Sequence, residues 1–365
     1  QTKKYSFLPF YANPPLKNKL YQNITSNGEK NFSLFSNNSL KIISKACSFL
    51  EDCSDHFGKH PQIGDNDSGR FLNLRPNWKK IKSNEAKVLF KYPKKFVNSS
   101  YHLFQDSLLI NNVIELASSV GIFRTKKTSK NSFHYEFGKY LAKNKKFDLI
   151  FPKNFYLHKD FGDRSKLKVL KKEILLNTKN IIFKKEIKLP QNILNSQLIY
   201  KYYPDFGIHI WKNSVLFISI RSIQKQNPFI KSHFHDDQLS ITFKLNNNYI
   251  FKDYGTFVYT PFPKIRNLYR SRKIHFPTSF EPNTDKKIFE NLDLKSVKCL
   301  YSGKKGFSGI YLSRYSIDKF VLQLQQNKVN IVMGSESRFN EEKIYLPSTS
   351  LDKFYYSPGY GILEN

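Results

Sequence analysis

Apolar residues recur at helical spacing in the first part of the chain. The segment SLKIISKACSFLEDC (Ser39–Cys53) places its apolar side chains at intervals of three and four residues, which is the spacing of one helix face. The segment SYHLFQDSLLINNVIELASSVGIF, which ends at Phe123, repeats this pattern, and Gly121 supplies a stop signal. The pattern therefore predicts two amphipathic helices in this part.

From about residue 148 onward the period changes from 3.6 to 2. Short β-rich runs such as NIIFKKEIKL, SVLFISIRS, LSITFKL and KFVLQLQQ follow one another, separated by turn residues. Many short strands without intervening helices indicate an antiparallel sandwich. We therefore predict an α+β chain of two domains, a helical region over residues 1–147 and a large antiparallel β-sandwich over residues 148–365.

Composition narrows the class of protein only slightly. The 60 Lys and Arg residues against 29 Asp and Glu give a net charge of +31, and a field of that sign attracts polyanions. The chain is also rich in Asn, Ile, Phe and Tyr, as proteins from A/T-rich genomes are, so the charge alone selects no partner. No run reaches the roughly 20 apolar residues of a membrane span. Walker, GxGxxG, GxSxG and HExxH motifs are absent from the sequence, so nothing supports nucleotide, dinucleotide or serine-hydrolase chemistry.

Three cysteines, Cys47, Cys53 and Cys299, cannot form a complete set of pairs. Cys47 and Cys53 flank a short helical stretch, and the pattern favours two buried thiols over a disulfide. The chain begins with Gln1 and not with Met, which indicates either a removed signal peptide or a fragment.

The densest polar cluster is SHFHDDQLS, which directly precedes the run LSITFKL. His233, His235 and Asp237 share the parity of the apolar residues that follow, so a continuous strand would carry them toward the core. In the hairpin that follows, Asp253 would lie opposite Ile241, about 20 Å from His235. A common site therefore requires the histidine segment to leave the sheet near Leu239 and fold back, which we favour.

A shared site of this kind would suit a metal ion. Two histidines and one aspartate around an open fourth position make a reasonable tetrahedral zinc site, and a third nitrogen could come from His275. The H-x-H spacing occurs often by chance, so histidines on the surface or satisfied in the core remain the alternative.

Three segments together resemble a known family. They are YYPDFGIHIWKNSVLFISIRS, SHFHDDQLSITFKLNNNYIFKDYGTFVY and RNLYRSRKIHFPT. In order and in most spacings they resemble the β-sandwich portion of the heparinase II/III-like polysaccharide lyases, over residues 202–278. The upstream loop PQIGDNDSGRF is similar to one that follows the helical toroid in bacterial relatives. The resemblance implies that the helical region is the C-terminal remnant of an α/α toroid.

The resemblance also implies an activity. It is the cleavage of a uronic-acid-containing acidic polysaccharide, of glycosaminoglycan or alginate type, by β-elimination, in a periplasmic or secreted bacterial protein. A base removes the C5 proton and an acid protonates the departing oxygen. His233 takes the catalytic position of the family, and His235, Asp253 and His275 take the positions that bind zinc in some members. Nucleic acid, which only the net charge suggests, is not an expected partner.

Several positions depart from the family pattern. His275 is followed by Phe276 and not by asparagine, and Arg272 stands where a threonine is usual. The Asn or His and the Tyr that the toroid supplies have no convincing counterpart in the first 60 residues, and Tyr101-His102 lies on the wrong side of the loop. The alternative function is therefore a catalytically inactive carbohydrate-binding or surface-polysaccharide assembly protein of the same fold.

Two further groups of charged residues lie outside the motif core. Asp65 and Asp67 in GDNDSGR are interpreted as turn residues that cap backbone groups, in preference to calcium ligands, and Arg70 as a partner for them or for a substrate anion. The basic cluster Arg266 to Lys273 is either a grip for an acidic glycan or the solvated tip of a hairpin.

Overall fold

The computed structural model describes the chain in segments. They are residues 37–65, 78–82, 84, 101–105, 110–123, 125, 132–142, 181–191, 193–194, 197–223, 233–258, 263–272, 274–276, 297–312 and 316–337. The boundary predicted between residues 147 and 148 lies outside them.

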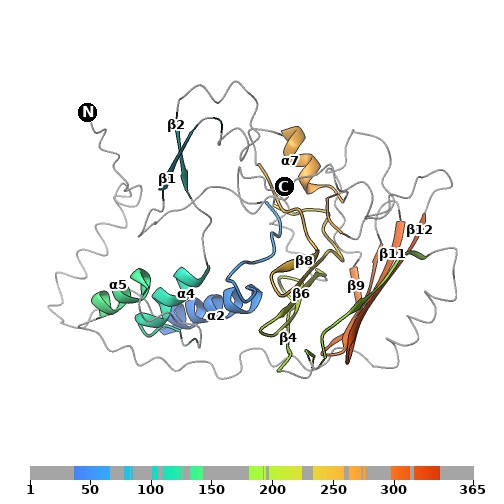
Figure 1. Ribbon diagram of the computed structural model, residues 1–365, viewed down its shortest axis with the longest axis horizontal. Coiled ribbons are helices and arrows are strands. Elements are labelled where there is room, and N and C mark those ends of the chain that lie inside the picture. Colours follow the sequence, from blue (N-terminus) through green and yellow to red (C-terminus); the bar gives the residue numbers. More distant parts are fainter. Residues whose placement is uncertain are drawn as a thin grey trace.

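The first part of the described chain contributes three helices and a two-stranded sheet (Figure 1). The elements are α2 (Asn37–Cys53), β1 (Trp78–Lys82), β2 (Tyr101–Gln105), α4 (Ile110–Ser119) and α5 (Phe133–Ala142). The helix predicted over Ser39–Cys53 is confirmed by α2. A small core of Cys47, Ile114, Ala117 and Phe123 joins α2 to α4.

The second predicted helix was wrong over its first residues. Tyr101–Gln105 forms strand β2, which pairs antiparallel with β1 from Tyr101 opposite Lys82 to Gln105 opposite Trp78. Its Tyr and Phe residues favour a strand once a partner is available, and a single-segment pattern cannot reveal that partner. The helix itself begins only at Ile110.

The second part forms two five-stranded antiparallel sheets, as the alternating pattern predicted. One has the order β4-β5-β6-β7-β8 and the other β3-β12-β11-β10-β9. The strands of the first are β4 (Ile199–Tyr203), β5 (Ile208–Lys212), β6 (Leu216–Arg221), β7 (Ile241–Leu245) and β8 (Asn248–Phe251). Those of the second are β3 (Ile181–Lys188), β9 (Val297–Gly303), β10 (Gly306–Leu312), β11 (Ser316–Gln325) and β12 (Lys328–Ser337). Strand β9 was not among the predicted runs.

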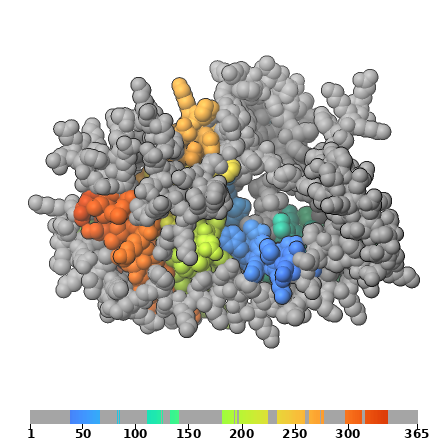
Figure 2. Space-filling view, turned by 180° about the vertical axis from the view of Figure 1, so that it is seen from behind, coloured from blue at the N-terminus to red at the C-terminus, as the bar shows by residue number. Residues whose placement is uncertain are grey.

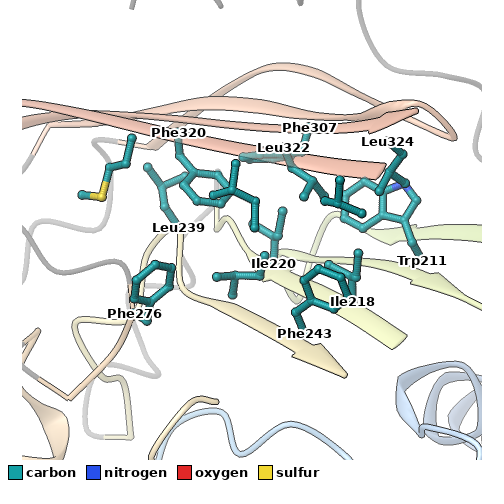
Figure 3. Close-up of a cluster of buried hydrophobic side chains, with 14 of the residues drawn as sticks. Trp211, Ile218, Ile220, Leu239, Phe243, Phe276, Phe307, Phe320, Leu322 and Leu324 are labelled. Atoms are coloured by element: carbon teal, nitrogen blue, oxygen red, sulfur yellow. The ribbon is translucent and has the colours of Figure 1, made fainter. Parts of the chain in front are cut away.

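The sandwich core lies between the facing sides of the two sheets (Figure 3). Alternate residues of each strand point inward, among them Ile218 and Ile220 of β6 and Phe320 and Leu322 of β11, all at most 1% exposed. Trp211 reaches across from β5 and donates its indole N–H to the carbonyl of Gly303 at 2.8 Å. This satisfies the polar atom of the largest core side chain.

The first sheet is covered on its other face as well, so β5 and β6 are buried along their whole length. The end of α2 and the loop after it lie on this face (Figures 1 and 2), where Phe49, Cys53 and Ile63 pack against Phe217 and Ile208. The alternating pattern places these strand residues on the outer side of the sheet, and only tertiary structure shows that this side is buried.

Lysines of the sheet fix the end of α2 in this position. Lys212 donates to the carbonyls of Glu51 and Ser54 at the helix end, where carbonyls lack the usual partner four residues on; the Glu51 carbonyl also accepts from the amide of Ser54 at 3.3 Å. Lys244 forms an ion pair with Asp55, and both side chains are at most 4% exposed. The docking of the loop 54–65 is therefore held by charged groups that are removed from water and paired.

In the described residues, no helix is both long and apolar enough to cross a bilayer. All three cysteines are free and buried, which confirms the prediction of buried thiols.

Candidate functional site

The histidine segment leaves the sheet where the fold-back interpretation placed the break. Strand β7 begins at Ile241, and Leu239 has a positive φ of 64°, which is rare for a non-glycine residue. The amide of Ser240 donates to the carbonyl of Asp237 at 3.0 Å, closing a turn. The continuous-strand alternative is therefore wrong, and the fold-back is confirmed.

The hairpin and a following segment bring the other two predicted ligands to the same place. Asp253 lies two residues beyond β8, whose Phe251 pairs with Phe243. The amide of Ile241 donates to the carbonyl of Phe276 at 2.8 Å, which holds His275 beside the start of β7. Distant parts of the chain thus meet at one end of this sheet.

Four side chains then form a continuous chain of contacts. The Nδ1 atom of His275 lies 3.0 Å from each carboxylate oxygen of Asp253, and its Nε2 atom lies 3.2 Å from Nδ1 of His235. Nε2 of His235 lies 3.2 Å from Oδ1 of Asp65. Asp65 is paired in turn with the guanidinium of Arg266. His235, Asp253 and His275, predicted to share a site, are therefore in sequential contact.

The pKa values of the two carboxylates in this group, Asp65 and Asp253, are both lowered. Burial alone would raise the pKa of Asp65, but hydrogen bonds from His235 and Arg266 lower it to about 2. Burial likewise works against ionisation of Asp253, yet His275 and the amide of Gly255 lower its pKa. Both carboxylates are thus ionised at neutral pH.

The two imidazoles are shifted in opposite directions. Burial lowers the pKa of His235 despite Asp65, whereas Asp253 outweighs burial and raises the pKa of His275. These directions favour a protonated His275, which donates to Asp253 and to His235, and a neutral His235, which donates its other N–H to Asp65. With Arg266 included, two negative and two positive charges balance in this buried group.

His233 differs from its neighbours because it faces solvent. Its side chain is 53% exposed, and its Nδ1 lies 3.9 Å from Oδ2 of Asp65. Its backbone carbonyl accepts a hydrogen bond from the amide of Asp65 at 2.9 Å. Gly64 has φ of 72°, and a Cβ there would lie 2.7 Å from the same carbonyl. Only glycine combines this conformation with so close an approach.

The donor set of His235, Asp253 and His275 suits zinc by residue type. In a tetrahedral site with bonds of about 2.0–2.1 Å, neighbouring ligand atoms are about 3.3 Å apart, close to the 3.0 and 3.2 Å seen here. His275, however, turns one nitrogen to Asp253 and the other to His235. Within the described residues, no group of three or more His, Cys, Asp and Glu side chains is arranged to hold a metal ion.

Helix α7 (Pro263–Arg270) and the turn after it hold the histidine segment in place. The guanidinium of Arg270 donates to the carbonyl of Phe234 at 2.9 and 3.1 Å, and the amide of Asp236 donates to the carbonyl of Arg270. Arg270 is 8% exposed. The interpretation of this basic cluster as a solvated hairpin tip was therefore wrong, because it is a helix whose arginines bind the chain itself.

Arg272, which stands at the family's threonine position, joins the histidine segment to the second sheet. It pairs with Asp318 of β11 and lies 3.4 Å from Asp236. Tyr311 donates to Asp236 at 2.9 Å, and its ring lies 4.5 Å from the Arg272 guanidinium. Arg272 and Asp318 are at most 2% exposed. Lys273 lies outside the described residues.

A pocket of about 300 Å³ adjoins the group at Asp65. It lies between α2, the loop 60–65, α4 and the turn between β4 and β5. Its lining residues are Phe49, Leu50, Cys53, His60, Pro61, Gln62, Ile63, Gly64, Asp65, Val113, Phe206 and Ile208.

The role of Asp65 in this group was not predicted from the sequence. The interpretation was a turn residue, but its side chain is 1% exposed and contacts His235 and Arg266. The one sequence signal for this role was that Asp65 belongs to the loop PQIGDNDSGRF, which is similar to a loop of the family. Asp67 and Arg70 lie outside the described residues, and of Tyr101 and His102 only the strand conformation is described.

Comparisons with known proteins match this part of the chain to one family. Residues 198–275 match the family model described as Heparinase II/III-like, C-terminal. The resemblance is confirmed over these residues. They contain His233, His235, Asp253 and His275, whereas Asp65 lies outside them. No curated protein matches the chain.

Among solved structures, a heparinase III with methylated lysines is similar, with 13% sequence identity and a TM-score of 0.30. The similarity covers 82% of this chain and 41% of that heparinase III. The chain thus spans less than half the length of the solved relative.

Proposed function

We propose that the chain forms part of a polysaccharide lyase that cleaves a uronic-acid-containing acidic polysaccharide by β-elimination. The observation that carries the proposal is the family match over residues 198–275, which include a solvent-facing histidine beside a buried charged group. Elimination breaks the C5–H and C4–O bonds of a uronate and forms a C4–C5 double bond. It needs a proton acceptor, a proton donor and a group that offsets the carboxylate charge.

His233 has the exposure that a reacting group requires. Its side chain is 53% exposed, while Asp65 beside it is fixed by Arg266 and His235. An imidazole is a suitable base near neutral pH, and Nδ1 of His233 lies 3.9 Å from Oδ2 of Asp65. We assign His233 the role of acid/base or of the group that offsets the uronate charge.

We also propose that His235, Asp253 and His275 hold a zinc ion. Their donor types and the spacing between neighbouring donor atoms support this, while His275 must present a nitrogen to the ion in place of one present contact. The ion would tie the histidine segment, the hairpin and the turn after α7 together, and Asp65 would orient His235 from its far nitrogen.

The alternative function is a carbohydrate-binding or surface-polysaccharide assembly protein without turnover. One observation favours it. Phe276, at the family's asparagine position, is 4% exposed and stacks on Phe251 at 4.5 Å. An apolar core residue there supplies no hydrogen bond to a substrate. Because acidic polysaccharides of this kind lie outside the cytoplasm, we place the protein in the periplasm or outside the cell under either function.

The test is to incubate the full chain with heparan sulfate, hyaluronan and alginate and to record the ultraviolet absorbance of the unsaturated uronate. We expect absorbance to rise with at least one polymer, and His233→Ala to lower the rate by about 10²–10⁴-fold, the usual contribution of a general acid or base. His56→Ala, at an exposed histidine that does not belong to the group, is the matched control. A polymer that is bound but never cleaved would favour the alternative.

A further inference from the structure

The pocket beside Asp65 has a lining that disfavours the binding of a charged ligand group. Most of its wall is apolar, formed by side chains such as Phe49, Leu50, Val113, Phe206 and Ile208. The rings of Phe49 and Phe206 lie 5.1 Å apart, edge to face. A bound group would therefore be removed from water mainly against carbon atoms.

None of the lining residues that the structure describes carries a cationic side chain to pair with an anion. Asp65 is a carboxylate and is already paired with Arg266. Burial lowers the pKa of His60, which leaves its imidazole neutral at neutral pH. A carboxylate or sulfate placed here would lose its hydration without gaining a cationic partner, which is strongly unfavourable.

The polar groups of the pocket are gathered in one loop. His60 and Gln62 belong to the loop 60–65, whereas the Asp65 carboxylate is 1% exposed and turned to His235 and Arg266. Aromatic and aliphatic side chains of the lining come from α2, α4 and the β4–β5 turn. A lining with hydrogen-bonding groups and aromatic rings matches a sugar, which has hydroxyl edges and apolar C–H faces. The volume of about 300 Å³ is at the lower end for small-ligand sites, suited to about one sugar residue.

The position of the pocket links it to the proposed reaction. Asp65 is one of the lining residues, and its Oδ2 lies 3.9 Å from Nδ1 of His233, so one residue links the pocket to the histidine assigned to the uronate. We propose that it binds an uncharged sugar adjoining the uronate, so that the substrate alternates uronate with an unsulfated, N-acetylated or neutral sugar. This rests on the proposed function. It excludes a polymer of uronate alone and one that carries sulfate on the neighbouring sugar.

The test compares oligosaccharides of equal length on the full chain at physiological salt. They are unsulfated heparosan and hyaluronan tetrasaccharides, a heparin tetrasaccharide and an alginate tetrasaccharide. We expect the unsulfated alternating compounds to bind at least tenfold more tightly than alginate and heparin. The net charge of +31 attracts highly sulfated heparin to the whole surface of the chain. The heparin-to-heparosan affinity ratio is therefore compared between variants, because this general attraction is nearly the same in each of them.

Three variants make the test specific to the pocket. Val113→Lys adds a cation to the lining at a residue that is 37% exposed, and we expect it to raise the heparin-to-heparosan affinity ratio at least tenfold. Val113→Gln changes polarity without charge, and Ile42→Lys adds the same charge at a residue of α2 that is 63% exposed and outside the lining. We expect neither to change the ratio.

The outcomes separate this inference from the proposed function. Three results would overturn the pocket assignment even if elimination is observed. Val113→Lys and Ile42→Lys could change the heparin-to-heparosan affinity ratio equally, neither could change it, or the unaltered chain could prefer alginate or heparin. The expected preference without any unsaturated product would uphold the pocket assignment and reject the lyase activity.

Discussion

The buried ion pair between Arg272 and Asp318 gives a sharp prediction about stability. Both side chains are at most 2% exposed, and the Asp318 carboxylate also accepts from Ser335 at 2.6 Å. In the Asp318→Ala variant, the guanidinium loses this carboxylate and keeps the more distant Asp236, at 3.4 Å, and the ring of Tyr311. Removing one partner of a buried pair costs about 3–5 kcal/mol, so we expect the free energy of unfolding to fall by that amount.

Replacing both partners should behave differently. The variant Arg272→Met, Asp318→Leu removes both charges of the pair, and Ser335→Ala removes the hydroxyl that loses its acceptor. Asp236, whose side chain is 16% exposed, loses Arg272 but keeps the hydrogen bond from Tyr311. We expect the stability of this variant to lie within about 1–2 kcal/mol of the parent, because such replacements are often neutral or stabilising. A pair that is exposed by 40% and 47%, Lys328 and Glu186, provides the control, and its loss should cost at most about 1 kcal/mol.

The assay is urea unfolding followed by the fluorescence of Trp211, which is fully buried in the sandwich. A Trp78→Phe background removes the second tryptophan of the chain. A loss below about 1 kcal/mol for Asp318→Ala would refute the reasoning, as would a combined variant whose loss equals the sum of the single losses.

Three further predictions concern the site and the thiols. Gly64→Ala should cost about 1–2 kcal/mol from its left-handed backbone alone, and it should remove hydrogen-exchange protection from the Asp65 amide, which bonds to the His233 carbonyl. Burial raises the pKa values of all three cysteine thiols, for Cys299 to about 12, so native protein should resist iodoacetamide and denatured protein should take up three equivalents. Zinc retained after dialysis should fall at least tenfold in His275→Ala and remain in His233→Ala; equal zinc in the two would argue against the metal assignment.

The sequence was informative where one local pattern decided the structure. Alternation identified most strands of the sandwich, and helical spacing identified α2. The fold-back at Leu239 could also be inferred, because a continuous strand would have separated His235 from Asp253 by about 20 Å. That inference needs only the number of residues between the two positions and the rise per residue of a strand.

The parts that were missed depend on contacts between distant segments. The YHLFQ segment forms a strand because WKKIK lies beside it, and neither segment indicates the other. Asp65 looked like a turn residue because its partners, His235 and Arg266, are 170 and 201 residues away. The arginines after Pro263 looked like a surface cluster, since a sequence does not show that Asp318 lies buried within reach of Arg272.

Asp65 has a consequence for how the molecule matures. The three residues His235, Asp253 and His275 come from the sandwich, but the carboxylate that completes their hydrogen bonding arrives with the loop after α2. A separately produced sandwich would hold Arg266 and His235 without their common acceptor. The complete group of His235, Asp253, His275 and Asp65 therefore forms only when the loop after α2 has docked on the sandwich.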